Sequence, residues 1–206
     1  MEKVLNCSLE RCEPDWSIQI EFDKSRTIKE KIQDFKKSEC EIQQKIQSHQ
    51  GELAHLNEYK KLLWATGHPL EDIIHSCFNN DLNLQISRPQ KGEDDGIFEF
   101  ESIIYLVEIK SGENKPARFD ELSKLIARMN KLKETHSKKN VKGLFIMNHY
   151  ANFSLNERKE PFSNQIKEHS KIENITLLTS PDLYNIMMEL LHGKITREDA
   201  IKKMLN

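Results

Sequence analysis

The sequence lacks the features that mark several protein classes. No apolar run approaches the roughly 20 residues needed to cross a bilayer, so no membrane-spanning segment is predicted. No secretory signal precedes the cysteines, and their spacing lacks the paired arrangement of structural zinc sites. These cysteines are Cys7, Cys12, Cys40 and Cys77. We therefore expect reduced thiols in a soluble, cytoplasmic protein with no membrane association.

The sequence also has little excess charge and few hydrophobic residues. The net charge is −2, so no global basic field indicates a nucleic-acid partner, although a local basic groove remains compatible with it. Hydrophobic residues make up 37% of the chain and charged residues 31%, which is polar for a compact domain. A large exposed helix would explain this composition. The length of 206 residues fits one domain with an appendage.

The N-terminal segment, residues 1–26, carries little information. The alternation from Trp16 to Phe22 predicts a short strand. Cys7 and Cys12 have no second cysteine pair to complete a metal site, so we expect them to pack rather than to bind metal.

A coiled-coil pattern occupies residues 27–66. Thr27 and Glu30 have the spacing of a capping box, and the apolar residues that follow recur in alternating steps of four and three. One seam holds Ile28, Phe35, Ile42, His49, Leu56 and Leu63, and the other holds Ile32, Glu39, Ile46, Leu53 and Lys60. The helix is predicted to end near Ala65. We expect self-association through residues 27–65, with a partner protein or the protein's own body as alternatives.

Residues 67–206 alternate between helical and strand patterns. Gly67 ends the first helix and Pro69 suits the start of the next. The sequence predicts strands over Leu82–Ile86, from Ile97, over Ile103–Lys110, over Val141–Met147 and over Ile175–Leu178. It predicts further helices over Phe119–Thr135 and Pro161–Ser170, and from Ser180 and Thr196.

Charged residues stand at the end of the predicted central strand. Residues Ile103–Val107 are apolar or aromatic and rich in β-branched types, which is typical of a buried strand. Glu108 and Lys110 are two residues apart, so their side chains point to the same face. A hairpin would fold the acidic turn Glu93-Asp94-Asp95 back toward Glu108. Charged side chains at the end of a buried strand are costly unless they are paired or serve a function.

The order of Asp95 followed by Glu108-Ile109-Lys110 resembles the PD-(D/E)xK motif of the restriction-endonuclease-like nucleases. The resemblance covers about residues 62–206, although the proline before Asp95 is absent. It implies an α/β fold with an αβββαβ core, preceded here by the long coiled-coil helix. Glu71, on the helix before the strands, matches an acidic residue that supports the metal site in many members. Its alternative role is to stabilise the dipole of that helix.

Phosphodiester hydrolysis would explain why two carboxylates and a lysine occur together. The reaction needs a nucleophilic water, relief of charge on the phosphate and help for the leaving oxygen, and a divalent metal supplies all three. Mg²⁺, with Mn²⁺ as a substitute, needs few carboxylates. Asp95, Glu108 and the backbone carbonyl of Ile109 are the expected ligands, with Asp94 and Glu93 as the alternatives to Asp95. Lys110 is expected to orient or activate the water, or to stabilise the developing charge.

The predicted helix after the motif is basic. Lys124, Arg128, Lys131 and Lys133 lie on it. A charge run is ordinarily a solvated face, but beside the motif a phosphate-contacting surface is the better interpretation. The resemblance also draws attention to Asn148 and Arg158, whose roles do not follow from their spacing.

The sequence therefore predicts a metal-dependent endonuclease, most plausibly acting on DNA. The resemblance suggests a role in defence against foreign DNA. An RNA nuclease uses the same chemistry and stays open. A different class also stays open: a coiled-coil adaptor whose nuclease-like domain binds nucleic acid or a partner protein without catalysis. The expected organisation is an N-terminal segment (1–26), a coiled-coil helix (27–66) and a nuclease-like domain (67–206).

Overall fold

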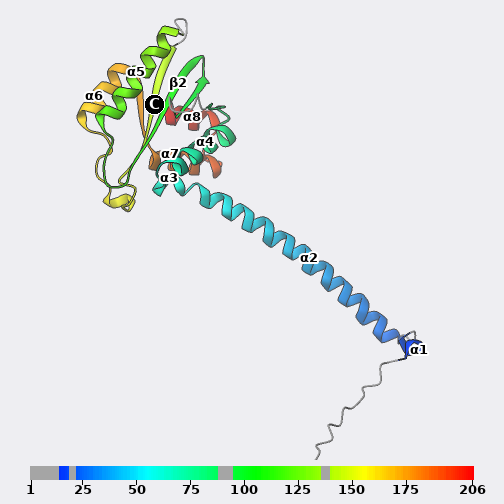
Figure 1. Cartoon of the computed structure of the whole chain (residues 1–206). Helices are drawn as coiled ribbons and strands as arrows, with labels where there is room; N and C mark the ends of the chain where they lie inside the picture. The colour runs from blue at the N-terminus through cyan, green and yellow to red at the C-terminus, as the bar shows by residue number, and fades with distance from the viewer. Residues whose placement is uncertain (1–13, 19–21, 88–94, 136–139) are drawn as a thin grey trace, which may run out of the picture. The chain divides into compact units, whose positions relative to one another are not determined.

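The computed structural model describes residues 14–18, 22–87, 95–135 and 140–206 (Figure 1). The chain divides into two compact units, Met1–Leu53 and Ala54–Asn206. None of the described helices combines the length and the apolar character that crossing a membrane requires.

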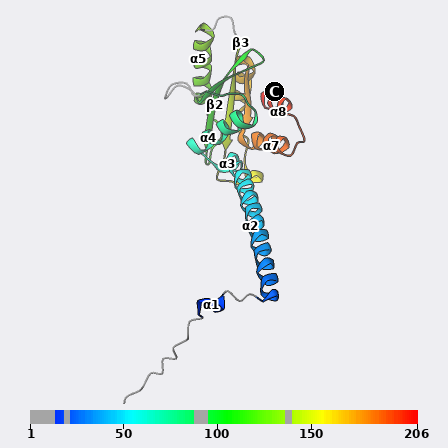
Figure 2. The same cartoon turned by 90° about the vertical axis from the view of Figure 1, so that its right-hand side faces the viewer.

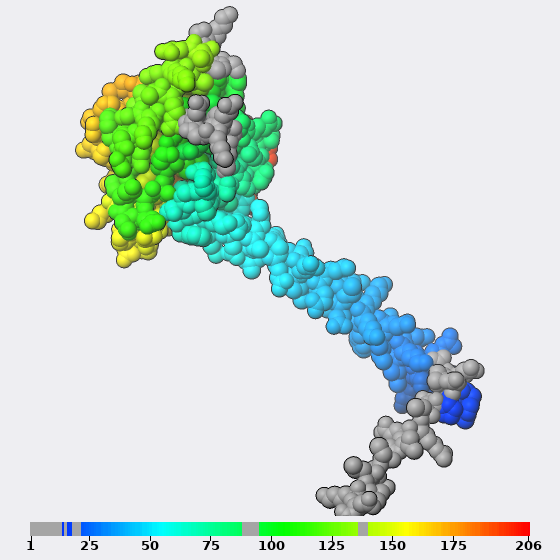
Figure 3. All heavy atoms as spheres, in the orientation of Figure 1, coloured from blue at the N-terminus to red at the C-terminus, as the bar shows by residue number. Residues whose placement is uncertain are grey.

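The first described elements are helical. Helix α1 spans Asp15–Ile18, so the strand expected from Trp16 onward is wrong at its start. Residues 19–21, 7 and 12 lie outside the described part of the chain. Helix α2 spans Asp23–Glu58 and has no buried residue (Figure 3). The structure thus confirms a long exposed helix, which accounts for the polar composition.

Both ends of α2 differ from the sequence prediction. The helix begins at Asp23, whose carboxylate suits the positive end of the helix dipole. Thr27 is therefore inside the helix and caps nothing, and its hydroxyl donates to the Asp23 carbonyl oxygen at 3.2 Å. At the other end the helix stops at Glu58, because Tyr59 is buried and donates to the Asp81 carboxylate at 2.9 Å. A separate short helix, α3, follows over Lys61–Trp64.

The second unit is built on a four-stranded mixed sheet in the order β1-β2-β3-β4. The strands are β1 (Gly96–Phe100), β2 (Ile103–Gly112), β3 (Asn140–His149) and β4 (Ile175–Thr179). Strands β1 and β2 are antiparallel, and the pairs β2/β3 and β3/β4 are parallel. Glu101 and Ser102 form the β1–β2 turn, and both have a positive φ, as a two-residue hairpin turn requires.

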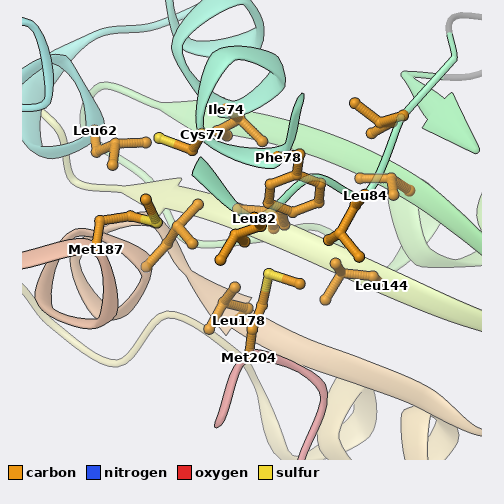
Figure 4. Close-up of a cluster of buried hydrophobic side chains, with 14 of the residues drawn as sticks. Leu62, Ile74, Cys77, Phe78, Leu82, Leu84, Leu144, Leu178, Met187 and Met204 are labelled. Atoms are coloured by element: carbon orange, nitrogen blue, oxygen red, sulfur yellow. The ribbon is translucent and has the colours of Figure 1, made fainter. Parts of the chain in front are cut away.

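Helices flank both faces of this sheet (Figures 1 and 2). Helices α5 (Phe119–Thr135) and α6 (Asn164–Glu173) cover one face, where Leu106 of β2 packs against Leu122 and Leu125. The other face is covered by α4 (His68–Ser76), α7 (Ser180–Leu191) and α8 (Arg197–Leu205). Figure 4 shows the core on that side, where Leu62, Ile74, Phe78, Leu144 and Met187 meet.

The strand expected over Leu82–Ile86 is not formed. A π-helix, Cys77–Asp81, continues α4, and the chain then runs irregularly to a single antiparallel bridge between Ser87 and Ile97. Leu82, Leu84 and Ile86 are buried, so the alternation of apolar and polar residues in this segment does reflect alternating burial. The intervening Asn83 and Gln85 have φ values of 54° and 50°, however, so the backbone is not extended. In the described residues two strands, not three, precede α5, and the αβββαβ order is not reproduced.

Several other boundaries agree closely with the sequence. Helix α5 has the predicted limits, because its apolar face packs on the sheet. Thr196 and Asp199 form a reciprocal capping box at the start of α8. Strand β3 runs on through Asn148 and His149, two residues beyond the predicted end at Met147.

Candidate active site

The β1–β2 hairpin brings Asp95 beside Glu108. Gly96 at the start of β1 is opposite Val107, so the preceding residue, Asp95, is next to Glu108 in the antiparallel pair. The Asp95 carboxylate oxygen Oδ2 accepts a hydrogen bond from the Ile109 backbone N–H at 2.7 Å. The convergence predicted from the sequence is therefore present. Glu93 and Asp94, the alternatives to Asp95, lie outside the described residues.

The ammonium group of Lys110 is surrounded by three oxygen atoms. Its Nζ lies 2.6 Å from Glu108 Oε1, 3.0 Å from Asp95 Oδ2 and 3.0 Å from its neighbouring carbonyl, Ile109 O. Burial by itself lowers the pKa of Lys110, but the hydrogen bond and charge of Glu108, with the charge of Asp95, outweigh burial and raise that pKa. The side chain is therefore a firmly protonated cation held by two carboxylates and a carbonyl.

Glu108 is held by a second cation on α5. Its side chain is 2% exposed, and its Oε2 lies 2.6 Å from Arg128 Nη2. Burial raises the pKa of Glu108 above the ordinary value, while the ion pairs with Lys110 and Arg128 oppose that rise. We call Asp95, Glu108, Lys110 and Arg128 the ion-pair cluster. It lies on the α5 side of β2, because Glu108 and Lys110 continue the face on which Leu106 packs against α5.

The contact made by Arg128 was not anticipated. The sequence grouped it with Lys124, Lys131 and Lys133 as a phosphate contact, whereas its guanidinium pairs with Glu108. Steps of four and three residues do place Lys124, Arg128 and Lys131 along one side of α5, and Lys124 and Lys131 are exposed. Lys133 is half-buried and lies about 200° round the helix from Lys131. Figure 3 shows the outer side of α5 at the surface of the second unit.

Helix α4 supports the cluster through His75 rather than through Glu71. The Glu71 carboxylate lies 3.3 Å from the ring of exposed His68, and the structure gives it no contact with the ion-pair cluster. His75, one turn later on the same helix, is buried and lies 2.6 Å from the Asp95 carbonyl oxygen. Since a carbonyl only accepts, the His75 Nε2 donates this bond. His75 was not singled out from the sequence, although its spacing of four from Glu71 places both residues on one face of the helix.

Gly96 makes the close approach of these elements possible. A Cβ atom at this position would lie 2.3 Å from the Ile86 side chain and 3.5 Å from the His75 ring. A larger residue would therefore push β1 away from Ile86 and His75, and would move the adjacent Asp95 with it.

Asn148 and Arg158 lie in a second polar cluster that anchors α3. Buried Asn148 donates to the Ala65 carbonyl at 2.8 Å and accepts from Arg158 at 2.9 Å. Arg158 also donates to the Leu63 carbonyl, and the Ser180 hydroxyl donates to the Leu62 carbonyl. We call Asn148, Arg158 and Ser180 the anchor cluster. The last carbonyls of a helix have no partner within it, so these side chains satisfy the end of α3.

A divalent cation fits the donor atoms of the ion-pair cluster. In the described part of the chain, no three His, Cys, Asp or Glu side chains form a group that could hold a metal ion. A site here would therefore consist of two carboxylates, one backbone carbonyl and water. These are the hard oxygen donors that Mg²⁺ prefers, and the same three oxygens already surround the Lys110 ammonium.

Comparison with known proteins does not assign the chain to a family. No protein-family model, curated protein or solved structure matches it.

Proposed function

We propose that the second unit is a metal-dependent nuclease that hydrolyses phosphodiester bonds of nucleic acid, with DNA as the first substrate to test. The observation that carries the proposal is the convergence of Asp95 Oδ2, Glu108 Oε1 and the Ile109 carbonyl on one cation position. This agrees with the resemblance of Asp95 and Glu108-Ile109-Lys110 to the PD-(D/E)xK motif. A role in defence against foreign nucleic acid is proposed on that resemblance alone.

In this proposal Asp95, Glu108 and the Ile109 carbonyl hold Mg²⁺ or Mn²⁺. A bound divalent ion neutralises phosphate charge and lowers the pKa of a water molecule. Lys110, whose ammonium lies beside these oxygens, would face the attacking water or the phosphate and stabilise negative charge that develops in the transition state. Arg128 opposes the rise that burial causes in the Glu108 pKa, and it fixes the orientation of the Glu108 carboxylate through their 2.6 Å contact.

The exposed side of α5 supplies contacts to the substrate backbone. Lys124 and Lys131 are exposed on the same side of the helix as Arg128, so their ammonium groups can reach phosphates near the ion-pair cluster. Such contacts position a nucleic acid without reading its sequence. Glu71 has no part in the proposal, because its carboxylate pairs with His68 and the structure gives it no contact with the ion-pair cluster.

One observation favours a second candidate, a non-catalytic domain that binds nucleic acid or a partner protein. The Lys110 ammonium already occupies the position between the expected ligands, so both carboxylates are neutralised without a metal. In this alternative the cluster is a structural feature of the β1–β2 edge, and no hydrolysis takes place.

The deciding experiment compares cleavage of plasmid, linear DNA, single-stranded DNA and RNA in Mg²⁺ or Mn²⁺ with a chelator control. The nuclease proposal expects cleavage that requires the metal and is lost in Asp95→Asn and Glu108→Gln. Glu71→Gln serves as the matched carboxylate control and should cleave like the wild type. Cleavage that persists in excess chelator would contradict the metal mechanism. A folded wild type that binds nucleic acid but is inert with every metal and substrate would support the alternative.

A further inference from the structure

Helix α2 carries an uncovered apolar stripe. Its large apolar side chains are between 43% and 72% exposed, namely Ile28, Ile32, Phe35, Ile42, Ile46, Leu53 and Leu56. A stripe of this spacing on a helix of 36 residues is stable in water only when another surface covers it. The positions of the polar residues within the stripe indicate what that surface is.

Two polar residues interrupt the stripe, Glu39 in one seam and His49 in the other. When two helices pair in opposite directions, each seam of one helix faces the other seam of its partner. Glu39 can then lie opposite His49 of a second copy, and this single choice fixes the whole register. It places Ile32 opposite Leu56, Ile46 opposite Ile42, and Leu53 opposite Phe35. Every apolar seam residue from Ile32 to Leu56 then meets an apolar residue, and the two polar residues meet each other.

Other arrangements of two copies are less compatible with the sequence. In a parallel pair each seam residue meets its own copy, so Glu39 would face Glu39. Among the residues that flank the seams, Lys31 of one copy would also lie against Lys36 of the other, and Lys24 against Lys29. Both are like-charged contacts. Shifting the antiparallel register by seven residues places the Glu39 carboxylate against Ile42 or Leu56.

The antiparallel register avoids most of these repulsions. The flanking lysines Lys29 and Lys36 lie near Asn57 and Gln50 of the second copy. Lys45 meets its own copy at the two-fold axis, and this is a like-charged contact that the register retains. One such contact, at the exposed edge of the seam, is a smaller cost than a buried pair of glutamates together with two sets of facing lysines.

We propose that α2 pairs with α2 of a second copy as an antiparallel two-stranded coiled coil, with Glu39 opposite His49. The overlap runs over residues 30–58, about 43 Å at ~1.5 Å per residue. His49 already lies 3.3 Å from Glu52 of its own chain through Nδ1, so its Nε2 faces the second copy's Glu39 without breaking that contact. This proposal does not depend on nuclease activity.

Charge reversal tests the register. The variants are Glu39→Lys, His49→Glu and the double variant that carries both. In the proposed pair each single change removes the attraction or creates a repulsion, and we expect the dimer Kd from sedimentation equilibrium to rise about tenfold. The double variant restores an opposite-charge pair and should return to within about threefold of the wild type. In a parallel pair the double variant would keep two like-charged contacts, lysine with lysine at position 39 and glutamate with glutamate at position 49, as many as His49→Glu alone. A double variant as weak as His49→Glu would therefore overturn the proposal.

Cysteine cross-linking tests the direction independently. The background replaces Cys7, Cys12 and Cys40 with Ser and keeps Cys77, which is buried. Ile32→Cys and Leu56→Cys proteins are oxidised separately and as a mixture. Only the mixture should form the disulfide dimer, because bridged cysteines need Cα atoms within about 7 Å. A disulfide dimer from the Ile32→Cys protein alone would overturn the proposal.

A wild-type protein that is monomeric at about 100 μM in sedimentation would also overturn the proposal. The apolar stripe would then need a foreign partner to cover it. Thermal melting of the second unit and helical circular dichroism serve as folding controls for every variant. Because Ile32, Glu39, Cys40, His49 and Leu56 are exposed on α2, changing them should leave the melting of the second unit unchanged.

Discussion

The two polar clusters of the second unit satisfy their charges in different ways. In the ion-pair cluster, ionised side chains from β2, from α5 and from Asp95 just before β1 neutralise one another, and Lys110 is 30% exposed. In the anchor cluster, the side chains of Asn148, Arg158 and Ser180 bond mainly to backbone carbonyls at the end of α3. A side chain that satisfies a buried carbonyl serves the fold, because no other group can replace it there. The charged side chains of the ion-pair cluster pair with one another at an accessible edge of the sheet, so a ligand can rearrange them.

This comparison predicts that changes in the ion-pair cluster reduce activity and changes in the anchor cluster reduce stability. The largest expected effect is at Lys110. Lys110→Ala should lower single-turnover cleavage by about 10²–10⁴-fold, because the lost cation acts on the chemical step. Affinity for nucleic acid should change little, since Lys124 and Lys131 remain. Cleavage at the wild-type rate by folded Lys110→Ala protein would remove this residue from the mechanism.

The next effect is at Asn148, which is 0% exposed. Asn148→Ala leaves the Ala65 carbonyl and one Arg158 donor without their partner, so the free energy of unfolding should fall by about 1–3 kcal/mol. Urea denaturation measures this change. Asn80→Ala is the matched control, because Asn80 is exposed and bonds only to the Ser76 hydroxyl, and it should cost less than about 0.5 kcal/mol. Loss of cleavage in Asn148→Ala without loss of stability would contradict the division between the clusters.

A smaller effect is expected on the basic side of α5. Replacing Lys124 and Lys131 with Ala should weaken binding to all nucleic-acid sequences alike and reduce the slope of log K against log salt by about 2. Lys202 and Lys203 on α8 are the control pair, because they lie on the other face of the sheet and pair with Glu198 and Glu189. A changed sequence preference with an unchanged salt slope would show that the α5 lysines do not contact phosphates.

The smallest effect is on the pH dependence of stability, through His149 next to Asn148. His149 is buried, and burial, followed by the charge of Arg158, lowers the pKa of its ring. A histidine whose folded pKa is depressed contributes its full stability above the unfolded value of about 6.5, and this contribution is lost as the pH falls through the folded pKa. Between pH 7 and 5 the melting temperature of the wild type should therefore fall more than that of His149→Phe. Equal slopes would mean that His149 does not titrate during unfolding.

The sequence predicted those parts of the structure that depend on local rules. Glu108 and Lys110 share a face because of the two-residue period of a strand, and the hairpin before them brought Asp95 into register. The limits of α5 followed from its apolar period. These features need no knowledge of which elements pack together.

The remaining features depend on contacts between distant parts of the chain. The side chain of Arg128 turns to Glu108 because β2 lies beneath that side of α5, and nothing in the local run of lysines reveals this. Helix α2 ends at Glu58 because Tyr59 reaches Asp81, 22 residues away. The alternation of Leu82, Leu84 and Ile86 gave their burial correctly, but it could not reveal the left-handed backbone at Asn83 and Gln85.

The charge balance of the ion-pair cluster has a consequence for how ligands enter it. Asp95 and Glu108 carry two negative charges, and Lys110 and Arg128 carry two positive ones, so the cluster is close to neutral. A divalent ion alone would leave an uncompensated double positive charge, and a phosphodiester alone would find no free cation there. Each would therefore raise the affinity of the cluster for the other, by the same factor in both directions. Titrating Mg²⁺ by calorimetry with and without an uncleavable phosphorothioate strand measures this factor, and the protein alone should hold the metal only weakly.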